Sequence, residues 1–342
     1  MKQTEELFQL IRSLGKHEKR FFKLFASIEE GDHIYMTIFD LIDKQKKYDE
    51  EAIVKQLGIQ KNVFAVQKHY LFNLLLSRIA ILHSSKESEL RMLLTQADIL
   101  YKKGLYPSCE KLLNKAKARA THLDMYGMLL EVLRMQHLNA WRKPDLNEAG
   151  RIIEEEKKVL ELQYNQKRYT HLANEIITLL SLSGDTRNKK VAARLAVLMK
   201  DPLITDENNA LTFHSRYTRL HTIFTYHFIH GDLKQQYHFA KKASALYEAH
   251  PEKIKHTPLQ HIYSLHNLMN TCNALKKYDE SKIYLDKLRS TASLLSNERE
   301  KVWAFFTYHD GNIGLYVKTG RFEEAVEVAE SLLKELKQTE LY

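Results

Sequence analysis

The chain has 342 residues, of which 44% are hydrophobic and 28% charged, so it can bury a core and is not an intrinsically disordered polypeptide. Only 11 glycines and 5 prolines interrupt it, which argues against a β-rich fold with its many turns. The long stretches between them consist mainly of Leu, Lys, Glu, Ala, Gln and Arg, which are good helix formers, and they predict an all-α protein.

The net charge of +9 is unevenly distributed along the chain. Residues 91–200 hold 20 basic and 12 acidic side chains, whereas residues 1–90 and 201–342 are almost balanced. A basic surface in the middle of the chain would favour an acidic partner, although a solvated helix face rich in lysine explains the same composition.

Several features favour a cytoplasmic location and no insertion into a membrane. Residues 1–6 lack the apolar run of a secretory signal. The most apolar segment, residues 71–82, contains Arg78 and is shorter than the about 20 residues that a membrane-spanning helix needs. Cys109 and Cys272 are too far apart in sequence to form a disulfide framework or a zinc motif, which suits a reducing compartment.

The N-terminal 85 residues form a region of their own. Apolar spacing predicts helices over residues 3–14, 16–29, 33–46, 50–57 and 62–83. Leu7, Leu10, Ile11 and Leu14 make one apolar stripe, and Phe21, Phe22, Leu24 and Phe25 make an aromatic one.

The segment from Asp49 through the turn at 58–61 has the rhythm of a helix-turn-helix. It would bring Asn62, Ala65, Lys68 and His69 to a nucleic-acid groove. Against this interpretation, the second helix opens with the apolar run 63–66, and the region is almost neutral although phosphate contacts call for basic charge. A cap on the rest of the chain, or a docking module, is the alternative.

A repeated pattern runs through the remainder of the chain. Its clearest copy is Tyr316-Val317-Lys318-Thr319-Gly320-Arg321-Phe322-Glu323-Glu324-Ala325, followed by Ala329 and Leu332. This copy resembles the second half of a tetratricopeptide repeat, in which a small turn residue precedes an aromatic residue and then a small packing residue. Similar copies place turns at positions 104, 144, 186, 231, 276 and 320, with spacings of 40, 42, 45, 45 and 44 residues. The family period is about 34 residues, which is shorter than the spacing of these copies. The resemblance is therefore to a TPR-like array rather than to a strict tetratricopeptide repeat.

The resemblance implies a right-handed superhelix of about six antiparallel helix hairpins over residues 86–342, preceded by the N-terminal helical module 1–85. The last helix, 323–337, alternates glutamates with Val326, Ala329, Leu332, Leu333 and Leu336, as expected of a terminal cap with a polar outer face.

Catalytic and cofactor motifs are missing from the sequence. It contains no glycine-rich phosphate loop, no H-E-x-x-H and no G-x-S-x-G, so we expect no enzymatic activity and no cofactor. His227 and His230 share a helix face and suit a metal, but no Asp, Glu or Cys completes a ligand set in the sequence, and no metal site is predicted.

In tetratricopeptide repeats, ligands usually lie along the concave face formed by the first helix of each hairpin. The family geometry implies a binding stripe on that face here. Its members are Arg91, Asp98, Tyr101, Glu131, Arg134, His171, Asn174, Thr178, His221, Thr225, His266, Asn270, Asn273 and Asp310.

These observations lead to two expectations of function. The first is a non-enzymatic scaffold that binds a protein or peptide segment on the concave face, although an ordinary hydrated groove explains the same residues. The second is a ligand-responsive transcriptional regulator, because peptide-sensing bacterial regulators join an N-terminal helix-turn-helix to a TPR-like sensor. The identity of the partner and the oligomeric state do not follow from the residues.

Overall fold

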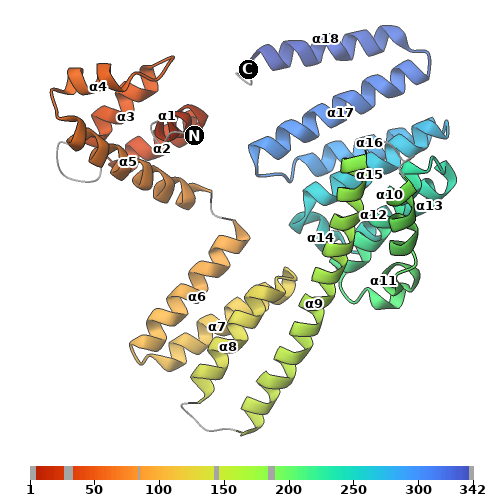
Figure 1. The fold of residues 1–342 in the computed structure, drawn as a ribbon, viewed down its shortest axis with the longest axis horizontal. Helices are drawn as coiled ribbons and strands as arrows, with labels where there is room; N and C mark the ends of the chain where they lie inside the picture. Colours follow the sequence, from red (N-terminus) through yellow and green to blue (C-terminus); the bar gives the residue numbers. More distant parts are fainter. Residues whose placement is uncertain (1–4, 27–33, 84, 142–145, 184–188, 339–342) are drawn as a thin grey trace. The chain divides into compact units, whose positions relative to one another are not determined.

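The computed structural model describes residues 5–26, 34–83, 85–141, 146–183 and 189–338 (Figure 1). All regular structure in these segments is helical, which confirms the all-α prediction for the described part of the chain. The chain divides into two compact units, residues 1–116 and 117–342. The predicted division at residues 85 and 86 falls inside the first unit, immediately before α6.

The first unit consists of helices, of which the first five follow the predicted N-terminal elements to within a few residues. They are α1 (Glu6–Ser13), α2 (Lys16–Ala26), α3 (Ile34–Lys44), α4 (Glu50–Leu57), α5 (Lys61–Leu82), α6 (Lys86–Lys102) and the first part of α7 (Tyr106–His122). Helices α1, α2 and α3 pack on α5, and this contact buries most of the unit's core.

The predicted aromatic stripe is buried through one member rather than as a whole. Phe22 is 1% exposed and packs against Phe39 of α3 with ring centroids 5.1 Å apart. Leu24 is 64% exposed, because two residues further along a helix point to nearly the opposite side.

The second unit contains the remaining helices and one short 3-10 turn. They are α8 (Tyr126–Ala140), α9 (Leu146–Ser183), α10 (Lys189–Leu198), α11 (Pro202–Thr205), the 3-10 turn Glu207–Asn209, α12 (Phe213–Ile229), α13 (Leu233–Glu248), α14 (Pro251–His256), α15 (Pro258–Ala274), α16 (Tyr278–Ala292), α17 (Glu298–Lys318) and α18 (Phe322–Gln338). Consecutive helices pack as pairs, α12 with α13, α15 with α16 and α17 with α18 (Figure 1).

The predicted turn positions have a common geometry wherever the structure describes them. Four of the six have a left-handed backbone, with φ of 74° at Gly104, 69° at Gly231, 59° at Lys276 and 76° at Gly320. In each case the amide of the next residue donates to the carbonyl five residues earlier, at 2.8–3.0 Å, which is the hydrogen bond of a Schellman helix end. Four predicted turns are thereby confirmed, and positions 144 and 186 lie outside the described residues.

Helix α9 departs from the arrangement expected between positions 144 and 186. Six separate hairpins require a break between the second helix of one and the first helix of the next. Instead α9 is continuous over 38 residues. Residues 151–183 contain neither glycine nor proline, so nothing in the local sequence ends the helix.

The last helix is covered less completely than predicted. Ala325 is buried, but Val326 and Leu333, assigned to the inner apolar face, are 56% and 55% exposed. Among the described helices, α18 packs mainly on α17, and this contact leaves the side with Val326 and Leu333 exposed. None of the described helices is both long and apolar enough to cross a membrane.

Candidate functional site

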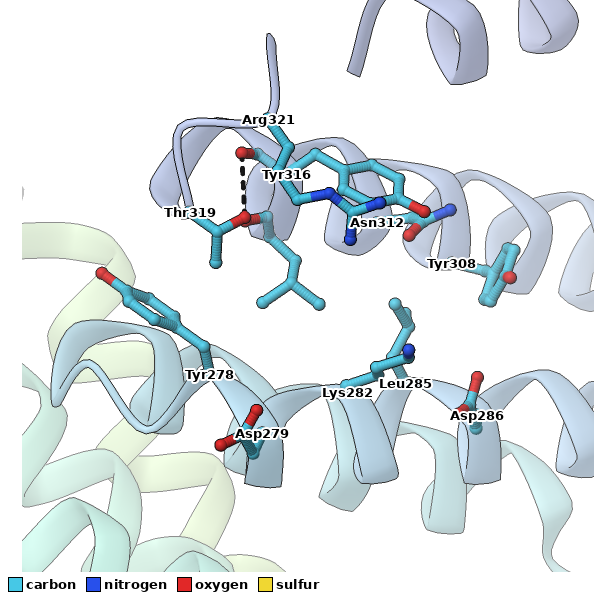
Figure 2. A pocket seen from close by; sticks show the side chains of 11 residues that line it. Tyr278, Asp279, Lys282, Leu285, Asp286, Tyr308, Asn312, Tyr316, Thr319 and Arg321 are labelled. Carbon is cyan, nitrogen blue, oxygen red and sulfur yellow. Dashed lines mark hydrogen bonds between the residues drawn. The ribbon is translucent and has the colours of Figure 1, made fainter. Parts of the chain in front are cut away.

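A groove of about 300 Å³ lies between α16 and α17 in the second unit (Figure 2). Side chains from both helices and from the turn after α17 point into it. Its lining consists of Tyr278, Asp279, Lys282, Leu285 and Asp286 from α16, and of Tyr308, Asn312, Leu315, Tyr316, Thr319 and Arg321 from α17 and the following turn.

Helical spacing places these residues on facing sides of the two helices. On α16 the positions 278, 282 and 286 recur every four residues, as do 308, 312 and 316 on α17, so each set forms one stripe. Leu285 and Leu315 are 3% and 8% exposed and form an apolar floor beneath the polar rim.

The C-terminal end of the groove is held by a small network. The guanidinium of Arg321 lies 4.6 Å from the ring centroid of Tyr316, within the range of a cation–π contact. Its Nε donates to Glu324 at 2.8 Å, which fixes the arginine over the ring. The hydroxyl of Thr319 donates to the carbonyls of Leu315 and Tyr316, so this turn is closed by its own side chain (Figure 2).

The lining has the composition of a protein-recognition surface. Three tyrosines and one arginine surround an apolar floor, and Tyr and Arg are among the residues that contribute most to binding at protein interfaces. The acidic Asp279 and Asp286 balance the basic Lys282 and Arg321, so the groove has no net formal charge. It therefore suits a segment with apolar and mixed polar side chains rather than a simple ion.

None of the fourteen residues of the predicted stripe lines this groove. Three of them belong to the first unit, where Arg91 pairs with Glu87 at 2.6 Å and Asp98 pairs with Lys102 at 2.6 Å. Tyr101, the third, packs against Tyr106 with ring centroids 5.6 Å apart.

Another part of the stripe does gather, on α15 and α17. The amide nitrogen of Asn270 lies 3.0 Å from Nε2 of His266, and because an amide nitrogen only donates, the imidazole accepts. Burial lowers the pKa of His266, an effect that the nearby Asp310 only partly offsets, which favours the neutral ring. Trp303 lies beside it with centroids 6.2 Å apart. The His266–Asn270 pair is thus a hydrogen-bonding unit within the stripe.

Asn273 is a correction to the stripe. It is only 5% exposed, and its Oδ1 accepts no hydrogen bond from the described residues, so it lies inside the helix packing rather than on a groove. It follows the fully buried Cys272 at the end of α15, where the helix turns toward α16.

The remaining members of the stripe divide into packed and exposed residues. His221 stacks on Tyr217 with centroids 5.9 Å apart, and burial lowers its pKa. The hydroxyl of Thr225 donates to the carbonyl of His221 at 2.8 Å. The exposed members are Glu131, Arg134, His171, Asn174 and Thr178.

Some of the basic residues that are in excess in the segment 91–200 lie near His171. It lines a shallow pocket of about 480 Å³ together with Arg168, Arg194 and Lys200. The Nε of Arg194 donates to Glu175 at 2.7 Å, so one of these cations is already paired.

Helices α4 and α5 are separated by the predicted turn, but they do not present a basic face that would contact a nucleic acid. Gly58 is left-handed, with φ of 63°, and separates α4 from α5. Lys61 pairs with Glu51 at 3.0 Å and Lys68 with Glu50 at 2.7 Å, so acidic residues of α4 neutralise these two lysines of α5.

The histidine pair considered for a metal is engaged in helix packing. The ring of His227 stacks on Phe239 with centroids 5.8 Å apart, and Nδ1 of His230 lies 2.8 Å from the carbonyl of Tyr226. Asp232 comes within 3.8 Å of His227, yet the described residues contain no group of three suitable ligands.

Burial raises the pKa of Cys272 to about 11, so its thiol is protonated at pH 7.

The groove was not predictable from the sequence, because several of its residues also belong to the repeat turns. Tyr316 and Arg321 belong to the repeat copy at residues 316–325, and Tyr278 follows the turn at 276; that their side chains border a cavity is evident only from the structure. The available signal was a tyrosine near two of the turns, Tyr278 two residues after position 276 and Tyr316 four residues before position 320.

Comparison with protein-family models, curated proteins and solved structures found no significant match to this chain.

Proposed function

We propose that the chain is a non-enzymatic scaffold that binds a peptide segment of another protein in the groove between α16 and α17. The observation that carries this proposal is the tyrosine- and arginine-lined cavity of about 300 Å³ above an apolar floor. Such a site buries an aromatic or aliphatic anchor, while the rim hydrogen-bonds the peptide backbone.

The proposal includes a TPR-like architecture for the helical pairs of the second unit. Its support is the recurrence of the same left-handed turn at Gly231, Lys276 and Gly320, each between two helices that pack on each other. Paired helices that each leave one face for a neighbour stack into arrays, and arrays of this kind present extended binding surfaces.

The test starts from a random peptide library selected on the full chain. The affinity of an enriched peptide is then measured by fluorescence anisotropy against Tyr308→Ala and Tyr316→Ala. Each variant should weaken binding by about tenfold or more, because truncation of a buried aromatic anchor costs about 2 kcal/mol. The matched control is Tyr164→Ala on α9, which removes a tyrosine that is 67% exposed and outside the groove.

A second pair of variants separates the groove from the predicted concave stripe. Asn270→Ala and Arg134→Ala leave the groove intact, since neither residue lines it. If peptide binding is lost in these two variants and retained in Tyr316→Ala, the peptide binds at the stripe, and the proposal that it binds in the groove is refuted.

A further inference from the structure

A larger pocket, of about 620 Å³, lies elsewhere in the second unit, between the 3-10 turn 207–209 and helices α12 and α13. Three cations line it, Arg216 and Arg219 from α12 and Lys242 from α13, against a single carboxylate, Glu207. The pocket therefore has a formal lining charge of +2. It is distinct from the α16–α17 groove, which shares none of these residues.

Arg219 is a largely buried charge without a close carboxylate. Its side chain is 11% exposed, while the nearest oxygen of Glu207 is 3.8 Å away on a side chain that is 72% exposed. That separation is beyond hydrogen-bonding distance, and a desolvated guanidinium gains most from a partner that hydrogen-bonds it directly.

Both guanidiniums are held in place through one nitrogen. Nε of Arg219 donates to the carbonyl of Ile204 at 2.8 Å, and Nε of Arg216 donates to that of Ala210 at 3.2 Å. The two arginines are three residues apart and share a face of α12. Fixing Nε leaves the terminal N–H groups as an oriented fork, which suits the paired oxygens of an oxyanion.

The rest of the wall is apolar. Leu211, which is 41% exposed, and the α13 residue Leu246 line the pocket beside the cations. A ligand that fills both parts must join a multiply charged oxyanion to an apolar group.

We propose that this pocket binds a phosphate monoester that bears an apolar substituent. A phosphate monoester is close to a dianion at pH 7, which matches the lining charge of +2, whereas a carboxylate supplies only one negative charge. The phosphate can belong to a phosphorylated side chain next to a leucine or to a free metabolite, and both present the same chemistry to Arg216 and Arg219.

The experiment titrates the full chain with phenyl phosphate, inorganic phosphate and benzoate by isothermal titration calorimetry. Phenyl phosphate should bind tightest, since it alone combines a dianion with an apolar group. A further arm uses N-acetyl-Leu-phosphoserine-Leu-amide: tighter binding of this peptide than of phenyl phosphate points to a phosphoprotein, and weaker binding points to a metabolite. Either result supports the pocket. Benzoate binding as tightly as phenyl phosphate would overturn the choice of phosphate.

Variants tie the binding to the pocket. Arg216→Ala and Lys242→Ala change exposed side chains, and Arg219→Lys keeps the charge but removes the fork; each should weaken phenyl phosphate by about tenfold. Glu207→Gln should strengthen it several-fold by removing the competing carboxylate, a gain that misfolding does not produce. Lys234→Ala, on α13 but outside the pocket, is the control for loss of a positive charge. Unchanged affinity in all four pocket variants, or no binding of phenyl phosphate at millimolar concentration, would refute the site.

Discussion

The ammonium group of Lys253 on α14 forms an ion pair with the carboxylate of Asp124, which lies 129 residues earlier in the turn between α7 and α8. Their side chains are only 15% and 24% exposed. Close to this pair, Nε2 of His256 lies 2.9 Å from Nε2 of His122, so two polar contacts link α14 to the α7–α8 turn. The links lie within the second unit and join parts of it that are far apart in sequence.

Breaking this ion pair on one side should destabilise α14. Lys253→Met or Asp124→Asn leaves the opposite charge largely buried, and we expect each to lower the local free energy of unfolding by about 2 kcal/mol. Asparagine is the chosen replacement because Asp124 has a φ of 53°, which asparagine tolerates. Hydrogen–deuterium exchange of the α14 amides measures the change.

The double variant distinguishes a true pair from two independent residues. Lys253→Met combined with Asp124→Asn should cost less than the sum of the two single changes, because no charge remains unpaired. Strict additivity would contradict the assignment. Lys255→Met, which removes an exposed cation from the same helix, should have little effect.

Gly311, in the middle of α17, allows this helix to approach its neighbours closely. A Cβ atom there would lie 2.7 Å from Cε of Met269 and 3.1 Å from Cδ1 of Leu285. Met269 is 1% exposed and has little room to move. We therefore expect Gly311→Ala to destabilise the second unit by about 1 kcal/mol, although alanine is the better helix former.

Gly314 on the same helix provides the control. A Cβ there would meet nothing within 4 Å, so Gly314→Ala should stabilise the protein by up to about 1 kcal/mol. Urea unfolding of both variants measures the contrast. Equal effects would show that the contact with Met269 does not constrain the packing.

Sequence alone predicted the features that depend on local chemistry. The helices before residue 85 and the turns at Gly104, Gly231 and Gly320 were predictable because helix periodicity and the tolerance of glycine for a left-handed backbone are properties of a few neighbouring residues. Lys276 shows the value of spacing, since its residue type alone does not indicate a left-handed turn, but its position in the repeat does.

The features that depend on tertiary packing were not predictable in this way. The burial of Asn273 and the half-exposed face around Val326 depend on which helices pack against α15 and α18. The cavity near Tyr316 lies between facing side chains of α16 and α17, and Arg219 is partly covered by the segment that precedes its helix. Amphipathic spacing identifies a buried stripe but not the depth of a groove between two stripes.

Lys276 should be the least favourable of the described repeat turns. A side chain with a φ of 59° is strained by about 1 kcal/mol relative to glycine, so Lys276→Gly should stabilise the α15–α16 pair by up to that amount. The reverse exchange, Gly231→Lys at a φ of 69°, should destabilise the α12–α13 pair by a similar amount. In thermal unfolding we expect the melting temperature to rise in Lys276→Gly and to fall in Gly231→Lys. A shift of the same sign in both variants would contradict this expectation.

The α4–α5 pair should not act as a DNA-reading module. The net charge of +9 can produce weak, salt-sensitive binding to any duplex, but Lys61 is already paired with Glu51. Lys61→Ala and Asn62→Ala should therefore leave the affinity of the full chain for random-sequence DNA unchanged within about twofold, with Lys46→Ala as a comparison outside α5. A marked loss of DNA affinity in the α5 variants, together with a weaker dependence of binding on salt, would support the regulator hypothesis.

His261 should make the second unit sensitive to acid. Burial lowers its pKa from 6.5 to about 4; a smaller contribution from Glu248 opposes this effect, and one from Lys287 adds to it. Nδ1 lies 3.2 Å from the hydroxyl of Thr291, and Nε2 is buried without a hydrogen bond from the described residues. The ring of Tyr247 packs against it at 4.9 Å, so the site holds a neutral imidazole.

The direction of the pH effect follows from proton binding. Between pH 6.5 and about 4 the unfolded chain takes up a proton at His261 that the folded chain does not, so stability falls as the pH falls through this window and is fully present above it. The shift corresponds to about 3 kcal/mol. Glutamine is neutral at both pH values. When urea unfolding is followed, the His261→Gln variant should therefore lose less stability than the wild type between these two pH values, by the amount just given. Because other buried histidines act in the same direction, the variant is compared with the wild type at each pH, and two parallel stability curves would exclude His261 as the source.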